Sequence, residues 1–161
     1  MTETRKITLT ALGIALVAAA TLVIRIPNSV NGYVNVGDTM IFVFAAIVDP
    51  FAAFLIGGIG SAMADVIGGY SYYAIFTLLV KGIEGLLACV LFQKLKKAWA
   101  AYIIAGGWMI VGYFFADWMV NQSAAMALVA VPGNFVQAAA SIILGCLLTP
   151  LFIRLKQEHH V

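Results

Sequence analysis

Residues 37–67 read GDTMIFVFAAIVDPFAAFLIGGIGSAMADVI, an apolar run with one interruption. A membrane-spanning helix needs about 20 apolar residues, so this run is too long for one span and too short for two long ones. The interruption is Asp49-Pro50. Proline disfavours helical geometry in the residue before it, and a carboxylate is costly in hydrocarbon. We therefore expect a tight turn there, between a short helix over residues 37–48 and a second helix over residues 50–67.

The composition of the whole chain also indicates a membrane protein. Of the 161 residues, 63% are hydrophobic and only 10% are charged, and the mean hydropathy is +1.03. A soluble domain carries about 25% charged residues, so this chain could not cover its own surface with polar groups. The composition excludes soluble globular and disordered proteins. A net charge of only +2, without a basic cluster, also excludes a nucleic-acid binder.

Four further apolar stretches have the length of a span: residues 8–26, 72–92, 99–120 and 132–153. The first resembles a signal peptide in part, but we expect it to remain in the membrane as a helix. Pro132 suits a helix start, and Thr149-Pro150 is expected to kink the last turns of the final helix. The sequence thus predicts an all-α membrane protein, with six transmembrane helices in one integral domain over residues 1–161.

The distribution of basic residues predicts the orientation. Cytoplasmic loops carry an excess of lysine and arginine. With both termini in the cytoplasm, six spans leave only Arg25 near the outer face. His159 and His160, in a short polar tail, receive no function. The basic residues then on the cytoplasmic side are Arg5, Lys6, Lys94, Lys96, Lys97, Arg154 and Lys156.

Five ionisable residues fall within the predicted spans or at their edges: Asp38, Asp65, Lys81, Glu84 and Asp117. A charge at mid-bilayer costs about 2.5–3.5 kcal/mol, so these side chains should face the bundle interior and pair with one another. Lys81 and Glu84 are three residues apart and can lie on one helix face. They are either a pair that keeps the bundle in register or the floor of an outward-facing polar cup.

Other polar residues gather at the predicted outer ends of the helices, which favours the cup. Asn134 and Gln137 share one face at the start of the last predicted helix, where a solute could be hydrogen-bonded. Tyrosines at this level are also typical of membrane-interface anchors. The inner half lacks a polar path, so we expect the chain to bind a solute without transporting it alone. The predicted substrate-binding residues are Tyr33, Asn35, Asp38, Asp65, Tyr73, Lys81, Glu84, Asp117, Asn134 and Gln137.

Small residues mark two helix surfaces. Ala11, Ala15 and Ala19 recur at four-residue spacing in the first span, a pattern typical of close helix contacts. This row serves either internal packing or docking of another membrane subunit. The glycines of residues 57–65 favour packing within the protein.

Motifs for catalysis and metal binding are missing from the sequence. It has no phosphate-binding loop for ATP, no zinc-protease motif and no nucleophile elbow. Cys89 and Cys146 lie in apolar runs and fit buried thiols. An intramembrane dyad of Asp65 and Asp117 matches no protease motif. We therefore expect no enzyme, no catalytic residue, no metal and no cofactor in this chain.

Several motifs together resemble the substrate-binding S components of energy-coupling factor (ECF) transporters, in particular the hydroxymethylpyrimidine/pyridoxine-type subgroup. The similarity covers nearly the whole chain. The alanine row of the first span is similar to the family's alanine motif. The motifs are Gly32-Tyr33-Val34-Asn35-Val36-Gly37-Asp38, Asp49-Pro50, Gly57-Gly58-Ile59-Gly60-Ser61-Ala62-Met63-Ala64-Asp65 and Lys81-Gly82-Ile83-Glu84-Gly85.

This resemblance implies a vitamin-binding subunit in the bacterial cell membrane. Such a subunit captures its vitamin outside and docks on a transmembrane coupling subunit that carries two cytoplasmic ATPases. ATP used by these partners then topples the S component and carries the vitamin inward. Pyridoxine or hydroxymethylpyrimidine is the expected substrate. The alternatives are pantothenate, for which Arg25 or Lys81 would supply a cation, another vitamin, or a membrane assembly protein that transports nothing.

Overall fold

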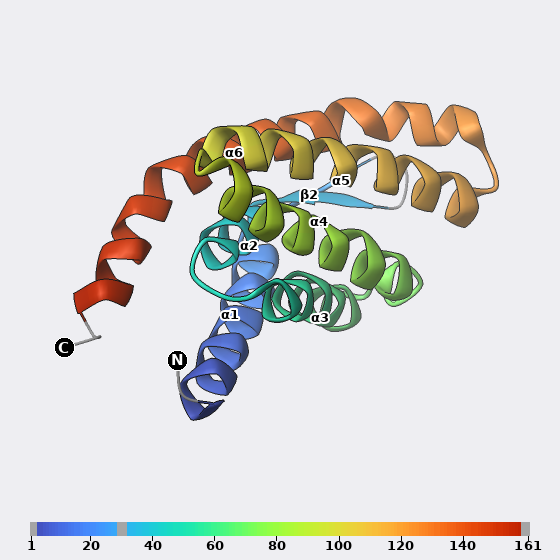
Figure 1. The fold of residues 1–161 in the computed structure, drawn as a ribbon. Helices are drawn as coiled ribbons and strands as arrows, with labels where there is room; N and C mark the ends of the chain where they lie inside the picture. Colours follow the sequence, from blue (N-terminus) through green and yellow to red (C-terminus); the bar gives the residue numbers. More distant parts are fainter. Residues whose placement is uncertain (1–2, 29–31, 159–161) are drawn as a thin grey trace.

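The structure, a computed structural model, describes residues 3–28 and 32–158. Two short strands, β1 (Arg25–Pro27) and β2 (Tyr33–Asn35), pair antiparallel. His159 and His160 lie outside the described residues. In Figure 1, α5 and α6 run side by side along one side of the bundle, with α4, α3 and α1 below them. The helices are α1 (Glu3–Val23), α2 (Gly37–Ala45), α3 (Pro50–Gly68), α4 (Ala74–Leu95), α5 (Ala98–Asn121) and α6 (Ala124–Glu158).

Five of the helices in the described part of the chain are long and apolar enough to cross a membrane, and α2 is the exception. Its nine residues rise about 14 Å, less than half of the roughly 30 Å hydrocarbon core. All of them except Met40 are buried. The all-α membrane protein is confirmed, whereas the second of its six predicted spans is a short central helix enclosed by the others.

The predicted turn at Asp49-Pro50 is confirmed. The Asp49 carboxylate accepts hydrogen bonds from the backbone amides of Phe51 (3.1 Å) and Ala52 (3.0 Å), and Pro50 takes the first position of α3. The Lys6 ammonium lies 3.1 Å from the same carboxylate. Burial alone would raise the pKa of Asp49, but the amides and Lys6 outweigh it and hold the pKa below its ordinary value. Asp49 is thus the N-cap of α3 and marks the turn between α2 and α3.

Basic side chains join different elements at the two ends of the bundle. The start of α1, the α2–α3 turn and the end of α6 meet, because Arg5 donates to the Lys156 carbonyl (3.5 Å) and the Lys156 ammonium donates to the Ile47 carbonyl (2.8 Å). We call this the basic end. At the opposite end, the Arg25 guanidinium donates to the Gly68 carbonyl (3.0 Å) and joins the strands to α3.

Two predicted helix boundaries are wrong. The first helix ends at Val23 rather than near residue 26, because residues 25–27 pair with β2. The last helix starts at Ala124 rather than at Pro132. The Ser123 hydroxyl accepts a hydrogen bond from the Met126 amide (3.3 Å), which caps an earlier start. Pro132 and Pro150 both lie inside α6, whose C-terminal part turns away from α5 in Figure 1.

Glycines bring α3 and α4 into backbone contact. A Cβ atom at Gly57 would lie 2.3 Å from the Lys81 carbonyl oxygen, and one at Gly85 would lie 2.4 Å from that of Ala53. Only glycine permits this approach. The glycines of α3 therefore serve internal packing, as predicted, and they fix α4 so that one of its faces meets α2.

Candidate functional site

A polar pocket lies at the end of the bundle opposite the basic end, among β2, α3, α4, α5 and α6. It encloses about 380 Å³ of free space, open solvent at its mouth included, of which water-sized molecules can enter about 30 Å³. Ligand entry therefore requires lining side chains to move. The pocket is lined by Asn28, Gly32, Tyr33, Asn35, Asp65, Tyr73, Thr77, Tyr113, Asp117, Asn134 and Gln137.

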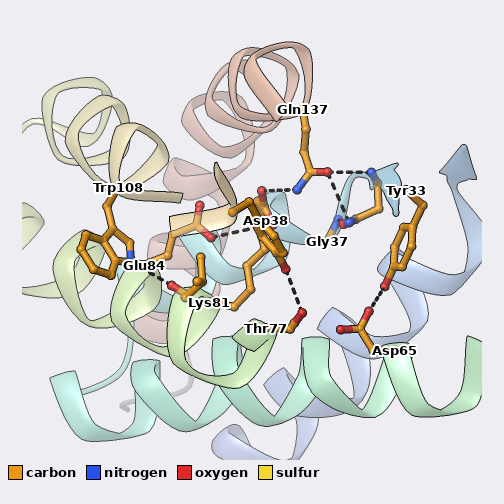
Figure 2. Close-up of polar contacts among 12 residues, drawn as sticks. Tyr33, Gly37, Asp38, Asp65, Thr77, Lys81, Glu84, Trp108 and Gln137 are labelled. Carbon is orange, nitrogen blue, oxygen red and sulfur yellow. Dashed lines mark hydrogen bonds and ion pairs between the residues drawn. The ribbon is translucent and has the colours of Figure 1, made fainter. Parts of the chain in front are cut away.

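Two tyrosine–aspartate pairs line the pocket. The Tyr33 hydroxyl donates to Asp65, as Figure 2 shows, and the Tyr73 hydroxyl donates to Asp117 at 2.5 Å. Burial, and then the negative charge of Asp65, raises the pKa of Tyr33 above its ordinary value. Tyr33 is therefore a protonated donor at physiological pH, and each carboxylate keeps an acceptor position for other groups.

Two buried polar atoms of the pocket have no hydrogen-bond partner among the described residues. They are Oδ2 of Asp65, an acceptor, and Nδ2 of Asn134, a donor. Asn134 lies near Asp117, but without hydrogen-bond geometry. Leaving such a group unsatisfied costs about 1–3 kcal/mol, so a ligand that pairs with both would recover this free energy on binding.

The pocket contains two functional candidates that the sequence analysis missed. Tyr113 on α5 donates to the Thr77 hydroxyl on α4 at 3.1 Å, and both residues line the pocket. Helical spacing could have identified them. Thr77 lies one turn before Lys81, and Tyr113 one turn before Asp117, so each shares a face with a predicted residue.

Asp38, Lys81 and Glu84 form a charged cluster beside the pocket rather than its floor. Lys81 pairs with Asp38, and its ammonium lies 3.2 Å from Glu84 Oε2. All three side chains are at most 1% exposed. Apart from the ion pair with Lys81, neither carboxylate oxygen of Glu84 has a hydrogen-bond partner in the described part of the chain. The predicted pairing of Lys81 with Glu84 is confirmed, and Asp38, 43 residues from Lys81 in sequence, completes it.

Gln137 connects the charged cluster to the pocket. Its Nε2 donates to Asp38 Oδ2 (2.8 Å), and its Oε1 accepts from the Asn35 backbone amide (2.9 Å). The Asn35 side chain in turn accepts from the Gly37 amide (2.8 Å) at the start of α2. Figure 2 shows Gln137 between Asp38 and this segment. Gln137 therefore holds β2 and α2 against α6 as well as lining the pocket.

The structure thus separates the ten predicted site residues into two groups. Seven of them line the pocket, while Asp38, Lys81 and Glu84 lie behind it. Neither Arg25 nor Lys81 lines the pocket, so the predicted cation for a carboxylate ligand is not placed there. Arg25 lies over the rings of Tyr33 and Tyr70, at 5.5 and 5.4 Å from their centroids. The seven lining residues are Tyr33, Asn35, Asp65, Tyr73, Asp117, Asn134 and Gln137.

The alanine row of α1 faces outward. Ala11, Ala15 and Ala19 are exposed, whereas α1 packs on the bundle through Gly13, Val17, Ala18 and Thr21. Of the two interpretations of this row, internal packing does not fit. An exposed row of small side chains leaves a shallow surface that another helix could approach closely.

Comparisons with known proteins found one family model and two relatives. A model of the family described as ECF-type riboflavin transporter, S component, matches residues 1–155. An uncharacterized protein from Pyrococcus woesei is 34% identical over 137 residues, which cover 80% of this chain and 88% of that protein. The thiamine precursor transporter HmpT of Lactococcus lactis subsp. cremoris (strain MG1363) is 28% identical over 153 residues, which cover 93% of this chain and 89% of HmpT.

Proposed function

The chain belongs to the family of ECF-type riboflavin transporter S components, and we propose that it binds a thiamine precursor of the hydroxymethylpyrimidine type. The family consists of membrane transporter components rather than enzymes. The observation that carries the proposal is the pocket, in which Asp65 Oδ2 and Asn134 Nδ2 are buried without partners among the described residues. A ligand that satisfies both must offer a donor and an acceptor on one small rigid frame.

An aminopyrimidine has this chemistry. Its amino group would donate to Asp65, and a ring nitrogen or the hydroxymethyl oxygen would accept from Asn134. Tyr33, Tyr73 and Tyr113 supply aromatic surface beside these groups, which suits a planar ring. HmpT, the thiamine precursor transporter from Lactococcus lactis, aligns with 93% of this chain. The relative and the pocket thus favour the same ligand class.

The alternatives fit the pocket less well. Pantothenate and other anionic vitamins would meet the carboxylates of Asp65 and Asp117, and no cation is among the described lining residues. Like charges brought together in a site of low dielectric repel strongly. Riboflavin, for which the family is named, is larger than hydroxymethylpyrimidine, so its entry would require larger movements of the lining side chains. Pyridoxine shares the ring size and hydroxyl groups of the proposed ligand and is the second candidate.

Membership of an S-component family supports the proposal that further subunits complete an importer. We propose that the basic end faces the cytoplasm of the cell, by the positive-inside rule, so that the pocket opens outward. The exposed row of Ala11, Ala15 and Ala19 would dock on a transmembrane coupling subunit. Two ATPase subunits bound to that subunit would hydrolyse ATP, since no nucleotide motif occurs in this chain.

Calorimetry on the purified chain tests the proposed ligand. We expect hydroxymethylpyrimidine to bind more tightly than pyridoxine, and pantothenate not to bind. The small molecule that co-purifies with the chain, identified by mass spectrometry, gives an independent readout. Tight binding of pantothenate or riboflavin together with no binding of hydroxymethylpyrimidine would refute the proposal.

A further inference from the structure

A second cavity lies at the basic end, far from the polar pocket. It is a groove between the first turns of α1, the end of α2 and the last turns of α6. Water-sized molecules could fill about 140 Å³ of it. Its lining consists of Leu9, Leu12, Phe44, Ile47, Phe152 and Leu155, with Arg5 and Lys156.

The interior of the groove is suited to hydrocarbon. A cavity of about this volume lined by leucine, isoleucine and phenylalanine stays dry and takes up apolar molecules. The rings of Phe44 and Phe152 meet edge-on, with centroids 6.1 Å apart, and form one wall. Between Arg5 and Leu12, α1 rises about 10 Å, so a flexible chain could lie along it.

The charged groups of the groove come from opposite ends of the chain. Arg5 Nη2 donates to the Lys156 backbone carbonyl at 3.5 Å, and Lys156 Nζ donates to the Ile47 carbonyl at 2.8 Å. A carbonyl is a neutral acceptor, so that bond does not neutralise the Lys156 ammonium. The Lys156 ammonium therefore keeps its positive charge at the rim of an apolar groove, beside the Arg5 guanidinium.

We propose that this groove binds one anionic phospholipid, with its phosphate between Arg5 and Lys156 and part of one acyl chain among the apolar side chains. Basic pockets between transmembrane helices are typical sites for anionic lipid headgroups. Part of one flexible acyl chain could occupy the roughly 140 Å³ of this groove, among its apolar side chains. This proposal does not depend on which vitamin the polar pocket binds or on the docking of a coupling subunit.

Native mass spectrometry of the delipidated chain, titrated with phosphatidylglycerol or phosphatidylcholine, tests the proposal. We expect phosphatidylglycerol to bind first and more tightly. Lys156→Gln should weaken its binding about fivefold, which corresponds to about 1 kcal/mol for a basic residue near an anionic headgroup. Lys97→Gln removes an exposed cation at the same end, outside the groove, and should change nothing.

A second variant tests the apolar part of the site. Leu12, 49% exposed at the groove wall, can be replaced by tryptophan with little risk to the fold. Leu12→Trp should abolish the preferential binding of phosphatidylglycerol, while the thermal melting temperature stays unchanged.

Three results would overturn the proposal. Equal binding of the two lipids would show that the groove does not recognise an anionic headgroup. Equal losses in Lys156→Gln and Lys97→Gln would indicate diffuse attraction rather than a site. Unchanged lipid binding in both groove variants, with loss of coupling-subunit binding, would identify the groove as a protein-docking surface.

Discussion

The contact between α3 and α4 predicts a large effect for one added methyl group. In Gly57→Ala, the new Cβ would lie 2.3 Å from the Lys81 carbonyl oxygen and 3.1 Å from the carbonyl carbon. Both neighbours are backbone atoms, so no side chain can rotate away and α4 itself must move. A shift of α4 would also displace the Lys81 ammonium from Asp38.

The expected magnitude follows from two opposing terms. Overpacking of this kind costs about 1–3 kcal/mol, and contact with backbone favours the upper half of that range. Alanine gains up to about 1 kcal/mol over glycine in a helix. The net loss of about 1–2 kcal/mol should lower the melting temperature by about 2–8 °C, at about 2–4 °C per kcal/mol for a chain of this size.

Thermal unfolding in detergent measures this effect, with Gly107→Ala as the matched control. Gly107 also lies inside a helix, but nothing is within 4 Å of its added Cβ. The control should therefore melt at the wild-type temperature or up to about 4 °C higher. If Gly57→Ala were as stable as Gly107→Ala, the close α3–α4 contact, and the placement of Lys81 that depends on it, would be wrong.

Three further predictions concern the network, the topology and the docking row. Gln137→Ala should lower the melting temperature as well as ligand affinity, because it leaves Asp38 with one donor fewer; weaker binding at unchanged stability would contradict its bridging role. In a variant whose native cysteines are replaced by alanine, Ala124→Cys should react with an impermeant thiol reagent from outside and Lys97→Cys should not; the reverse pattern would invert the proposed orientation. Ala15→Trp should block assembly with the coupling subunit while vitamin binding, measured by calorimetry, stays intact; loss of both would assign the row to folding.

Local signals in the sequence predicted the parts of the fold that depend on neighbouring residues. Asp49-Pro50 predicted the α2–α3 turn, because an N-cap and a first-turn proline act within a few residues. The β1–β2 pair was not predicted, since three-residue strands carry too little pattern. Pro132 wrongly predicted a later start of α6, because this proline lies inside the helix, which begins at Ala124 after the cap at Ser123.

The sequence predicted which residues belong to the site better than it predicted the contacts between them. Because a charged side chain is costly in the hydrocarbon of a membrane, the sequence indicated that the ionisable residues face the bundle interior and pair. The spacing of three residues predicted the contact of Lys81 with Glu84. The second partner of Lys81, Asp38, lies on another helix, so no local spacing indicated that contact. Only the tertiary structure shows that Gln137 connects the charged cluster to the pocket.

Ligand affinity of the Asn134→Ala variant tests the central claim, binding of a small hydrogen-bonding ring in the polar pocket, most directly. Ser141→Ala is the matched control. Asn134 and Ser141 are both buried on α6 with a polar atom that lacks a partner among the described residues, but only Asn134 lines the pocket. Calorimetry with hydroxymethylpyrimidine should show an affinity lower by about five- to thirtyfold for Asn134→Ala, the equivalent of about 1–2 kcal/mol for one lost hydrogen bond, and no change for Ser141→Ala. Unchanged affinity in Asn134→Ala, or an equal loss in both variants, would contradict the assignment of the pocket as the binding site.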